Sequence, residues 1–148
     1  MLELFKRYTF WLIAAILFMF VTAILHSLSF FVSPQPNNDS ERQLMTLMTT
    51  YREDMGGGFH PSMWELFTAL SACYPLLCLL GGFTLGYMLL KSVEVEVMRG
   101  VILINLAIFS TCFVVMTALT FLPPIIFTGL IAVNLLAAYL TIPNADSA

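Results

Sequence analysis

Four apolar runs, each long enough to cross a bilayer as a helix, fill most of this 148-residue chain. A helix rises about 1.5 Å per residue, so the roughly 30 Å of membrane hydrocarbon takes about 20 residues. The runs lie at about 8–31, 63–90, 100–122 and 125–142. Hydrophobic residues make up 59% of the chain and charged residues 10%, unlike the balance of a soluble domain. The sequence therefore predicts an all-α integral membrane four-helix bundle, with residues 1–148 as a single membrane domain.

Prolines mark where these runs bend or stop. Pro75 stands inside the second run, and a residue without an N–H predicts a kink or irregular turn there. Pro123 and Pro124 together predict the end of the third run and a very tight turn into the fourth. Pro143 closes the fourth run.

The basic residues divide unequally between the two sides of such a bundle. Loops rich in Lys and Arg stay in the cytoplasm, so we expect both termini in the cytoplasm and residues 32–62 outside. The net charge is −3 and no basic tract is present, so the bilayer is the expected partner and nucleic acid is not. The expected cytoplasmic side carries Lys6, Arg7, Lys91 and Arg99, and the outer side carries Arg42 and Arg52.

The outer loop has a helical pattern of its own at about 40–55. Ser40 and Gln43 have the spacing of a capping box, and Gly56 to Gly58 would end the helix. Apolar residues recur at helical spacing, so we expect a short amphipathic helix that lies flat. It could be a passive connector on the outer leaflet or a lid over a binding cavity. The stripe consists of Leu44, Leu47, Met48, Tyr51 and Met55.

Small and polar residues indicate where the helices pack together. Gly82 and Gly86 have the GxxxG spacing that permits close helix contact. We favour a neighbour within the bundle, with a second copy or another membrane protein as the alternatives. Asn105 and Asn134 are candidates for hydrogen bonds between helices, because an unpaired amide in hydrocarbon costs several kcal/mol.

His26, late in the first run, is the strongest candidate for a functional residue, because a titratable group at that depth requires a partner. His26 and Glu65 are the candidate catalytic pair, with His26 as base. Each has a structural alternative: for His26 it is a hydrogen bond to a neighbouring helix, and for Glu65 it is a capping box with Ser62. No metal-binding motif is present, so we expect no metal, and any cofactor stays open. The predicted ligand-binding set is His26, Ser29, Glu53, Asp54, His60 and Glu65.

Several short motifs follow one another over the first two predicted spans and the loop between them. His26 is followed by Ser27 and Leu28, then by a Pro-Gln-Pro segment, Glu41 to Met45, Asp54 to Gly56, Ser62 to Leu66 and a Gly81-Gly82 pair. Over residues 14–90 or so the chain resembles small bacterial four-span integral membrane proteins of unknown function. The resemblance implies a bacterial inner-membrane location and assigns no functional residue.

Three interpretations of function follow. The first is a non-catalytic membrane protein, either an accessory subunit or a bundle that binds lipid or a small apolar ligand. It is favoured by the scarcity of charge within the membrane, because among the acidic, basic and histidine residues only His26 and Glu65 lie near the membrane core. The second is a small enzyme that uses these two residues on a lipid or quinone-like substrate at the outer leaflet. The third is a transporter or channel subunit, which has the least support because no series of charged residues could line a pore.

Overall fold

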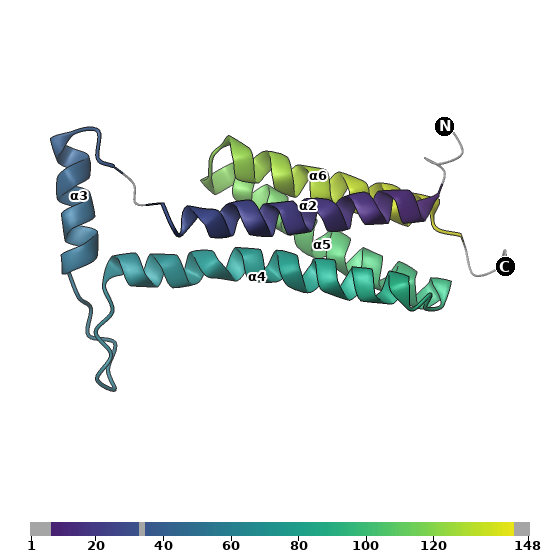
Figure 1. Cartoon of the computed structure of the whole chain (residues 1–148), viewed down its shortest axis with the longest axis horizontal. Helices are drawn as coiled ribbons and strands as arrows, with labels where there is room; N and C mark the ends of the chain where they lie inside the picture. The colour runs from purple at the N-terminus through teal and green to yellow at the C-terminus, as the bar shows by residue number, and fades with distance from the viewer. Residues whose placement is uncertain (1–6, 33–34, 144–148) are drawn as a thin grey trace. The chain divides into compact units, whose positions relative to one another are not determined.

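A computed structural model describes residues 7–32 and 35–143, so the basic residue Lys6 lies outside the described ranges. These residues form five α-helices, shown in Figure 1. In chain order they are α2 (Tyr8–Ser29), α3 (Asp39–Thr50), α4 (Met63–Leu90), α5 (Val95–Leu119) and α6 (Leu122–Thr141).

Four of the described helices, α2, α4, α5 and α6, are long and apolar enough to cross a membrane. The prediction of an all-helical chain with four such runs is therefore confirmed. The bounds of α4 match the expected ones. By contrast, α2 ends two residues early, at Ser29, and α5 begins five residues early, at Val95.

The two consecutive prolines lie in a different place from the one predicted. They belong to the first turn of α6, and the chain turns before them, at Thr120 and Phe121. The first N–H groups of a helix have no partner within it, so Pro123 and Pro124 lose nothing there, and their fixed φ suits the helix start. Pro75 lies inside α4, which remains α-helical through it, so no irregular turn interrupts the helix there.

The described chain divides into two compact units. The first contains residues 7–22 and 78–143, which supply the start of α2, the end of α4, and all of α5 and α6. Its core is built from residues at helical spacing, such as Leu12, Ala15 and Met19 on α2. The other helices contribute Cys78, Leu85, Met98, Ile102, Phe109, Ile131, Leu135 and Ala138, all at most 2% exposed.

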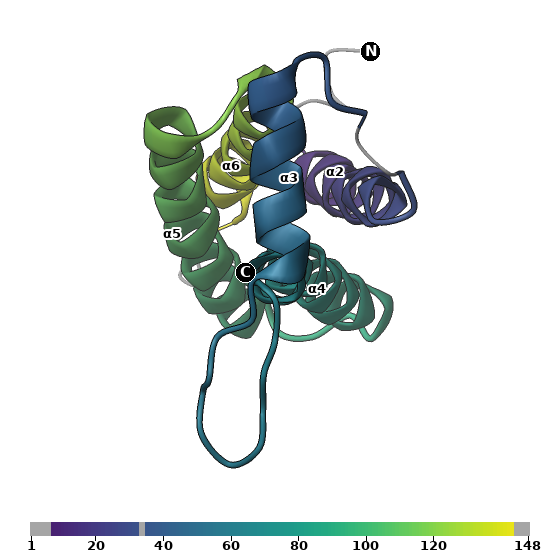
Figure 2. The same ribbon diagram turned by 90° about the vertical axis from the view of Figure 1, so that its left-hand side faces the viewer.

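The outward faces of the first unit are apolar as well. Leu17 on α2 and Val133 on α6 are both about 60% exposed, at 58% and 61%. Figures 1 and 2 show α5 and α6 side by side, joined by the short turn. Helices that are hydrophobic on all sides are typical of a membrane bundle.

Gly81 marks the closest helix packing in the first unit. A Cβ atom placed on Gly81 would lie 3.0 Å from Asn105 Oδ1 and 3.3 Å from both Met19 Sδ and a ring carbon of Phe109. These three residues come from α5 and α2, so only a residue without a side chain fits at this point of α4.

The two GxxxG glycines differ from each other. A Cβ on Gly82 would lie 3.3 Å from the Phe20 ring, whereas a Cβ on Gly86 would have no neighbour within 4 Å. The predicted close contact therefore exists at Gly82 but does not extend to Gly86.

The two buried asparagines bond within their own helices. Asn105 Nδ2 donates to the Val101 carbonyl at 2.9 Å, and Asn134 Nδ2 donates to the Leu130 carbonyl at 2.7 Å. Each amide nitrogen thus finds its acceptor one turn earlier in its own helix, and not on a neighbouring helix as the sequence predicts.

The second unit contains the described residues of 23–77: the end of α2, all of α3 and the first half of α4. Asn38, rather than the predicted Ser40, caps α3, because its side chain accepts a hydrogen bond from the Glu41 N–H at 2.9 Å. Glu41 in turn accepts from the Asn37 N–H at 2.6 Å. This bond is the main reason why the pKa of Glu41 is lowered, so its ionised form holds the start of α3.

After α3 the chain forms an irregular hairpin before entering α4, visible as the long loop in Figure 2. Arg52 and Ser62 form an antiparallel bridge, and the Met55 N–H donates to the Phe59 carbonyl at 3.1 Å. Gly56, Gly57 and Gly58 turn the chain with φ values of 77°, 63° and 82°, which glycine adopts without steric cost. The glycines thus make the hairpin turn, and α3 ends before it, at Thr50.

We predict that Gly81→Ala is less stable than Gly86→Ala by about 1 to 3 kcal/mol, the usual range for overpacking. Both substitutions bring the same gain in helix propensity, so their difference isolates the crowding against Asn105, Met19 and Phe109. Unfolding of the two variants in detergent micelles measures this difference. Equal stability would mean that α4 does not pack closely at Gly81.

Candidate functional site

His26, the main candidate from the sequence, binds the backbone and side chain of one residue on α4. Its Nε2 atom lies 3.2 Å from the Ser71 carbonyl oxygen and 2.9 Å from the Ser71 hydroxyl oxygen. Both residues belong to the second compact unit. The imidazole therefore ties the end of α2 to the first half of α4.

Pro75 explains why the Ser71 carbonyl has no hydrogen-bond donor within α4. In an α-helix the carbonyl of one residue accepts the N–H of the residue four positions later. For Ser71 that residue is Pro75, which has no N–H. The donor is supplied by His26 when the proton sits on Nε2, so the lost helical hydrogen bond favours this tautomer.

Two aromatic rings hold the imidazole in place. Phe30 and Tyr74 both meet His26 edge to face, with ring centroids 5.4 Å and 5.3 Å away. His26 is half-buried, and Pro75 is buried. The imidazole is thus fixed by one hydrogen-bonding residue and two rings.

Glu65 is occupied at the start of α4. One carboxylate oxygen accepts from the Ser62 N–H at 2.6 Å and the Ser62 hydroxyl at 2.9 Å, and the Glu65 N–H donates to Ser62 Oγ at 3.2 Å. This is the predicted capping box. Arg52 adds an ion pair to the same oxygen at 3.2 Å.

The remaining predicted site residues bond locally. Ser29 donates its hydroxyl to the His26 carbonyl at 2.6 Å, and Asp54 accepts from the Gly56 N–H at 2.9 Å within the hairpin turn. His60 Nδ1 is 3.8 Å from Asp54 Oδ1, and both side chains are largely exposed. The Glu53 N–H donates to the Pro61 carbonyl at 3.1 Å.

The two candidate catalytic residues therefore have separate sets of partners. His26 lies with Ser71, and Glu65 lies with Ser62 and Arg52. Ser71 follows Glu65 by six residues, or about 9 Å along α4. Among residues 7–32 and 35–143, no cluster of three or more His, Cys, Asp or Glu side chains could hold a metal ion.

Three residues of this arrangement are not among those predicted from the sequence: Ser71 as the partner of His26, Tyr74 as a ring beside it, and Arg52 as the partner of Glu65. Ser71 had a signal in the sequence, because a residue four positions before a proline in a helix has a free carbonyl. Arg52 had none, because its contact with Glu65 depends on how the hairpin folds back.

Comparison of the chain with protein-family models, with curated proteins and with solved structures finds no match. The arguments about function consequently rest on the contacts within this chain.

We predict that His26→Ala destabilises the protein, and that it does so less when Pro75 is also replaced by alanine. In Pro75→Ala the residue at position 75 has an N–H for the Ser71 carbonyl, so that carbonyl no longer depends on His26. Leaving a buried acceptor unsatisfied costs about 1 to 3 kcal/mol, which sets the size of the expected coupling.

A double-mutant cycle of unfolding free energies in detergent measures this coupling. Ser71→Ala is the control, because it removes the hydroxyl and leaves the carbonyl bond in place. If His26→Ala costs the same in both backgrounds, the imidazole does not serve the freed carbonyl.

Proposed function

We propose that this chain is a non-catalytic four-span membrane protein, either an accessory subunit or a bundle that binds lipid or a small apolar ligand. The observation that carries the proposal is the bond from His26 to Ser71, next to the proline that frees the Ser71 carbonyl. The best candidate for a catalytic base is engaged in a structural hydrogen bond.

The chemistry of the two candidate residues supports this conclusion. A general base needs a nitrogen lone pair within reach of the substrate. Nε2 of His26 is engaged with Ser71, which leaves Nδ1 as the nitrogen with a lone pair, and the rings of Phe30 and Tyr74 pack against the same imidazole. A catalytic carboxylate would have to act on the imidazole or the substrate, and Glu65 is instead bonded to Ser62 and Arg52. Both groups have partners that account for their presence without turnover.

The proposed location is a bacterial inner membrane, with both termini in the cytoplasm. Four helices of sufficient length and apolarity are compatible with a multi-pass protein. The orientation is supported by basic residues before α2, directly after α4 and near the start of α5, which are Lys6, Arg7, Lys91 and Arg99. The bacterial setting rests on the resemblance to small four-span proteins of that source.

In this arrangement α3 is an amphipathic helix that lies in the outer membrane interface. The support is its exposure: α3 has no buried residue, and Leu44 and Leu47 are 57% and 60% exposed. An apolar stripe that protein leaves uncovered is stabilised by the boundary between headgroups and acyl chains. This favours the passive connector over a lid.

We predict that His26→Gln keeps the thermal stability and the co-purifying lipids and small molecules of the natural protein. Glutamine has an amide N–H that can donate to the Ser71 carbonyl, but it cannot act as a base at neutral pH. Melting in detergent and mass spectrometry of the extracted molecules provide the two measurements. His26→Ala is the matched variant, which lacks the donor and should melt at a lower temperature.

The enzyme interpretation makes the opposite prediction for His26→Gln. A variant that stays folded but accumulates a new lipid or quinone-like molecule, as an unconverted substrate would, contradicts the non-catalytic proposal.

For the orientation, we predict that single cysteines at Asn37 and Ser147 react with an impermeant thiol reagent from opposite sides of the membrane. The background should have Cys73, Cys78 and Cys112 replaced by serine or alanine. An odd number of crossings between the two positions gives this result. Labelling of both positions from one side would contradict four spans.

A further inference from the structure

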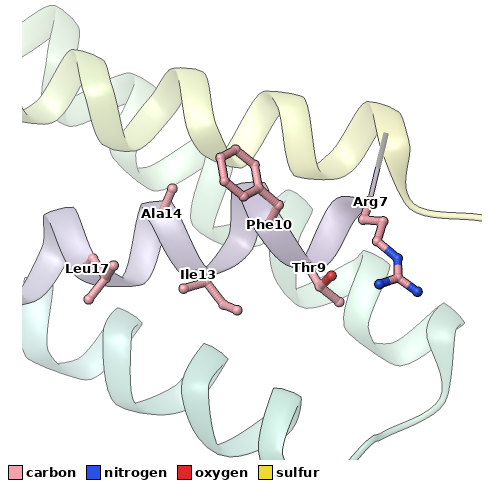
Figure 3. A pocket seen from close by; sticks show the side chains of 6 residues that line it. All are labelled: Arg7, Thr9, Phe10, Ile13, Ala14 and Leu17. Carbon is pink, nitrogen blue, oxygen red and sulfur yellow. The ribbon is translucent and has the colours of Figure 1, made fainter. Parts of the chain in front are cut away.

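A groove runs along the outward face of α2 in the first compact unit. It is an open depression of about 230 Å³ and lies opposite the buried residues Leu12, Ala15 and Met19. Figure 3 shows Arg7 at one end of the groove and Leu17 at the other, with Thr9 and Ile13 between them on α2. The lining consists of Arg7, Thr9, Phe10, Ile13, Ala14 and Leu17.

The length of the groove matches one leaflet of a bilayer. Arg7 and Leu17 are ten residues apart, which is about 15 Å along a helix, or half of the roughly 30 Å hydrocarbon core. Its polarity changes in the same direction, from a guanidinium through a hydroxyl to aliphatic side chains. This is the polarity profile of a phospholipid, from headgroup to acyl chain.

We propose that the groove binds one anionic phospholipid of the leaflet at the N-terminal end of α2. The Arg7 guanidinium binds the phosphate, to which it can donate two parallel hydrogen bonds, and an acyl chain lies along Ile13 and Leu17. Among the described residues no carboxylate lines the groove, so the charge of Arg7 favours an anion. The inference rests on the membrane placement proposed above and adds a specific ligand to it.

A lipid fits the groove better than a second transmembrane helix does. Faces that pack against another helix are rich in small residues, as Gly81 shows in this unit. The groove has two small residues, Thr9 and Ala14, but they are five positions apart and so do not form the i, i+4 stripe of a close helix contact, and larger side chains such as Phe10 lie between them. Ile13 is 47% exposed, which leaves apolar surface for a flexible acyl chain to cover.

The test is native mass spectrometry of the full chain in detergent micelles, titrated with dioleoylphosphatidylglycerol or dioleoylphosphatidylcholine. We expect phosphatidylglycerol to bind more tightly, with one molecule bound first. Arg7→Gln should weaken that binding about fivefold, which is the share that one basic residue contributes to attraction by anionic lipid. Lys91→Gln is the matched control, since it makes the same charge change outside the groove and should bind normally.

Ile13→Trp provides a second test that leaves the charge intact. It adds bulk on an exposed part of the groove, away from the buried face, so it should reduce phosphatidylglycerol binding without loss of helicity. Equal affinity for the two lipids would overturn the proposal. So would an equal loss in Lys91→Gln and Arg7→Gln, because it would mean that the attraction is spread over all cations.

Carbonate extraction of membranes tests the membrane placement separately from the lipid site. Release of the chain by carbonate would contradict the membrane placement and the lipid site together. A chain that stays in the membrane but does not discriminate between the two lipids would contradict the lipid site alone.

Discussion

The Ser71 carbonyl has lost its ordinary donor, because Pro75 stands four residues later without an N–H. In hydrocarbon there is no water to take over, so a backbone group in that position must find a partner within the protein. His26 supplies it from α2 at 3.2 Å, and the Ser71 hydroxyl lies 2.9 Å from the same nitrogen. His26 in α2 thus supplies the hydrogen-bond donor that Pro75 in α4 lacks.

This interaction changes what His26 means for function. A histidine in an apolar run is expensive without a partner, and this expense made it the best functional candidate in the sequence. The partner is a backbone carbonyl that a proline has left without a donor. The free-energy cost of leaving either group unpaired therefore favours the packing of α2 against α4. Glu65 follows the same logic at the start of α4, where Ser62 and Arg52 bind its carboxylate.

The sequence predicts local features of this protein well and contacts between distant segments poorly. The four spans follow from the length of the apolar runs, and the capping box of Ser62 and Glu65 follows from spacing alone. The predicted start of α3, with Ser40 as its cap, was wrong. Asn38 and Ser40 both suit a helix cap, and it is the side chain of Asn38 that accepts the hydrogen bond. The partner of His26 could not be read from α2, because it depends on the register of α2 against α4, which side-chain packing sets.

The same limit separates the inside of the first unit from its outside. On α2, Met19 is buried and Leu17 is exposed, although both are large apolar residues. In a soluble protein, hydrophobicity would tell the two faces apart, but in lipid both faces are apolar and other signals must do so. Gly81 marks an inner face because Asn105 and Phe109 approach it too closely for a side chain. Arg7 marks an outer face because its exposed guanidinium lies beside apolar side chains, a combination that matches the headgroup and acyl chain of the lipid proposed to bind there.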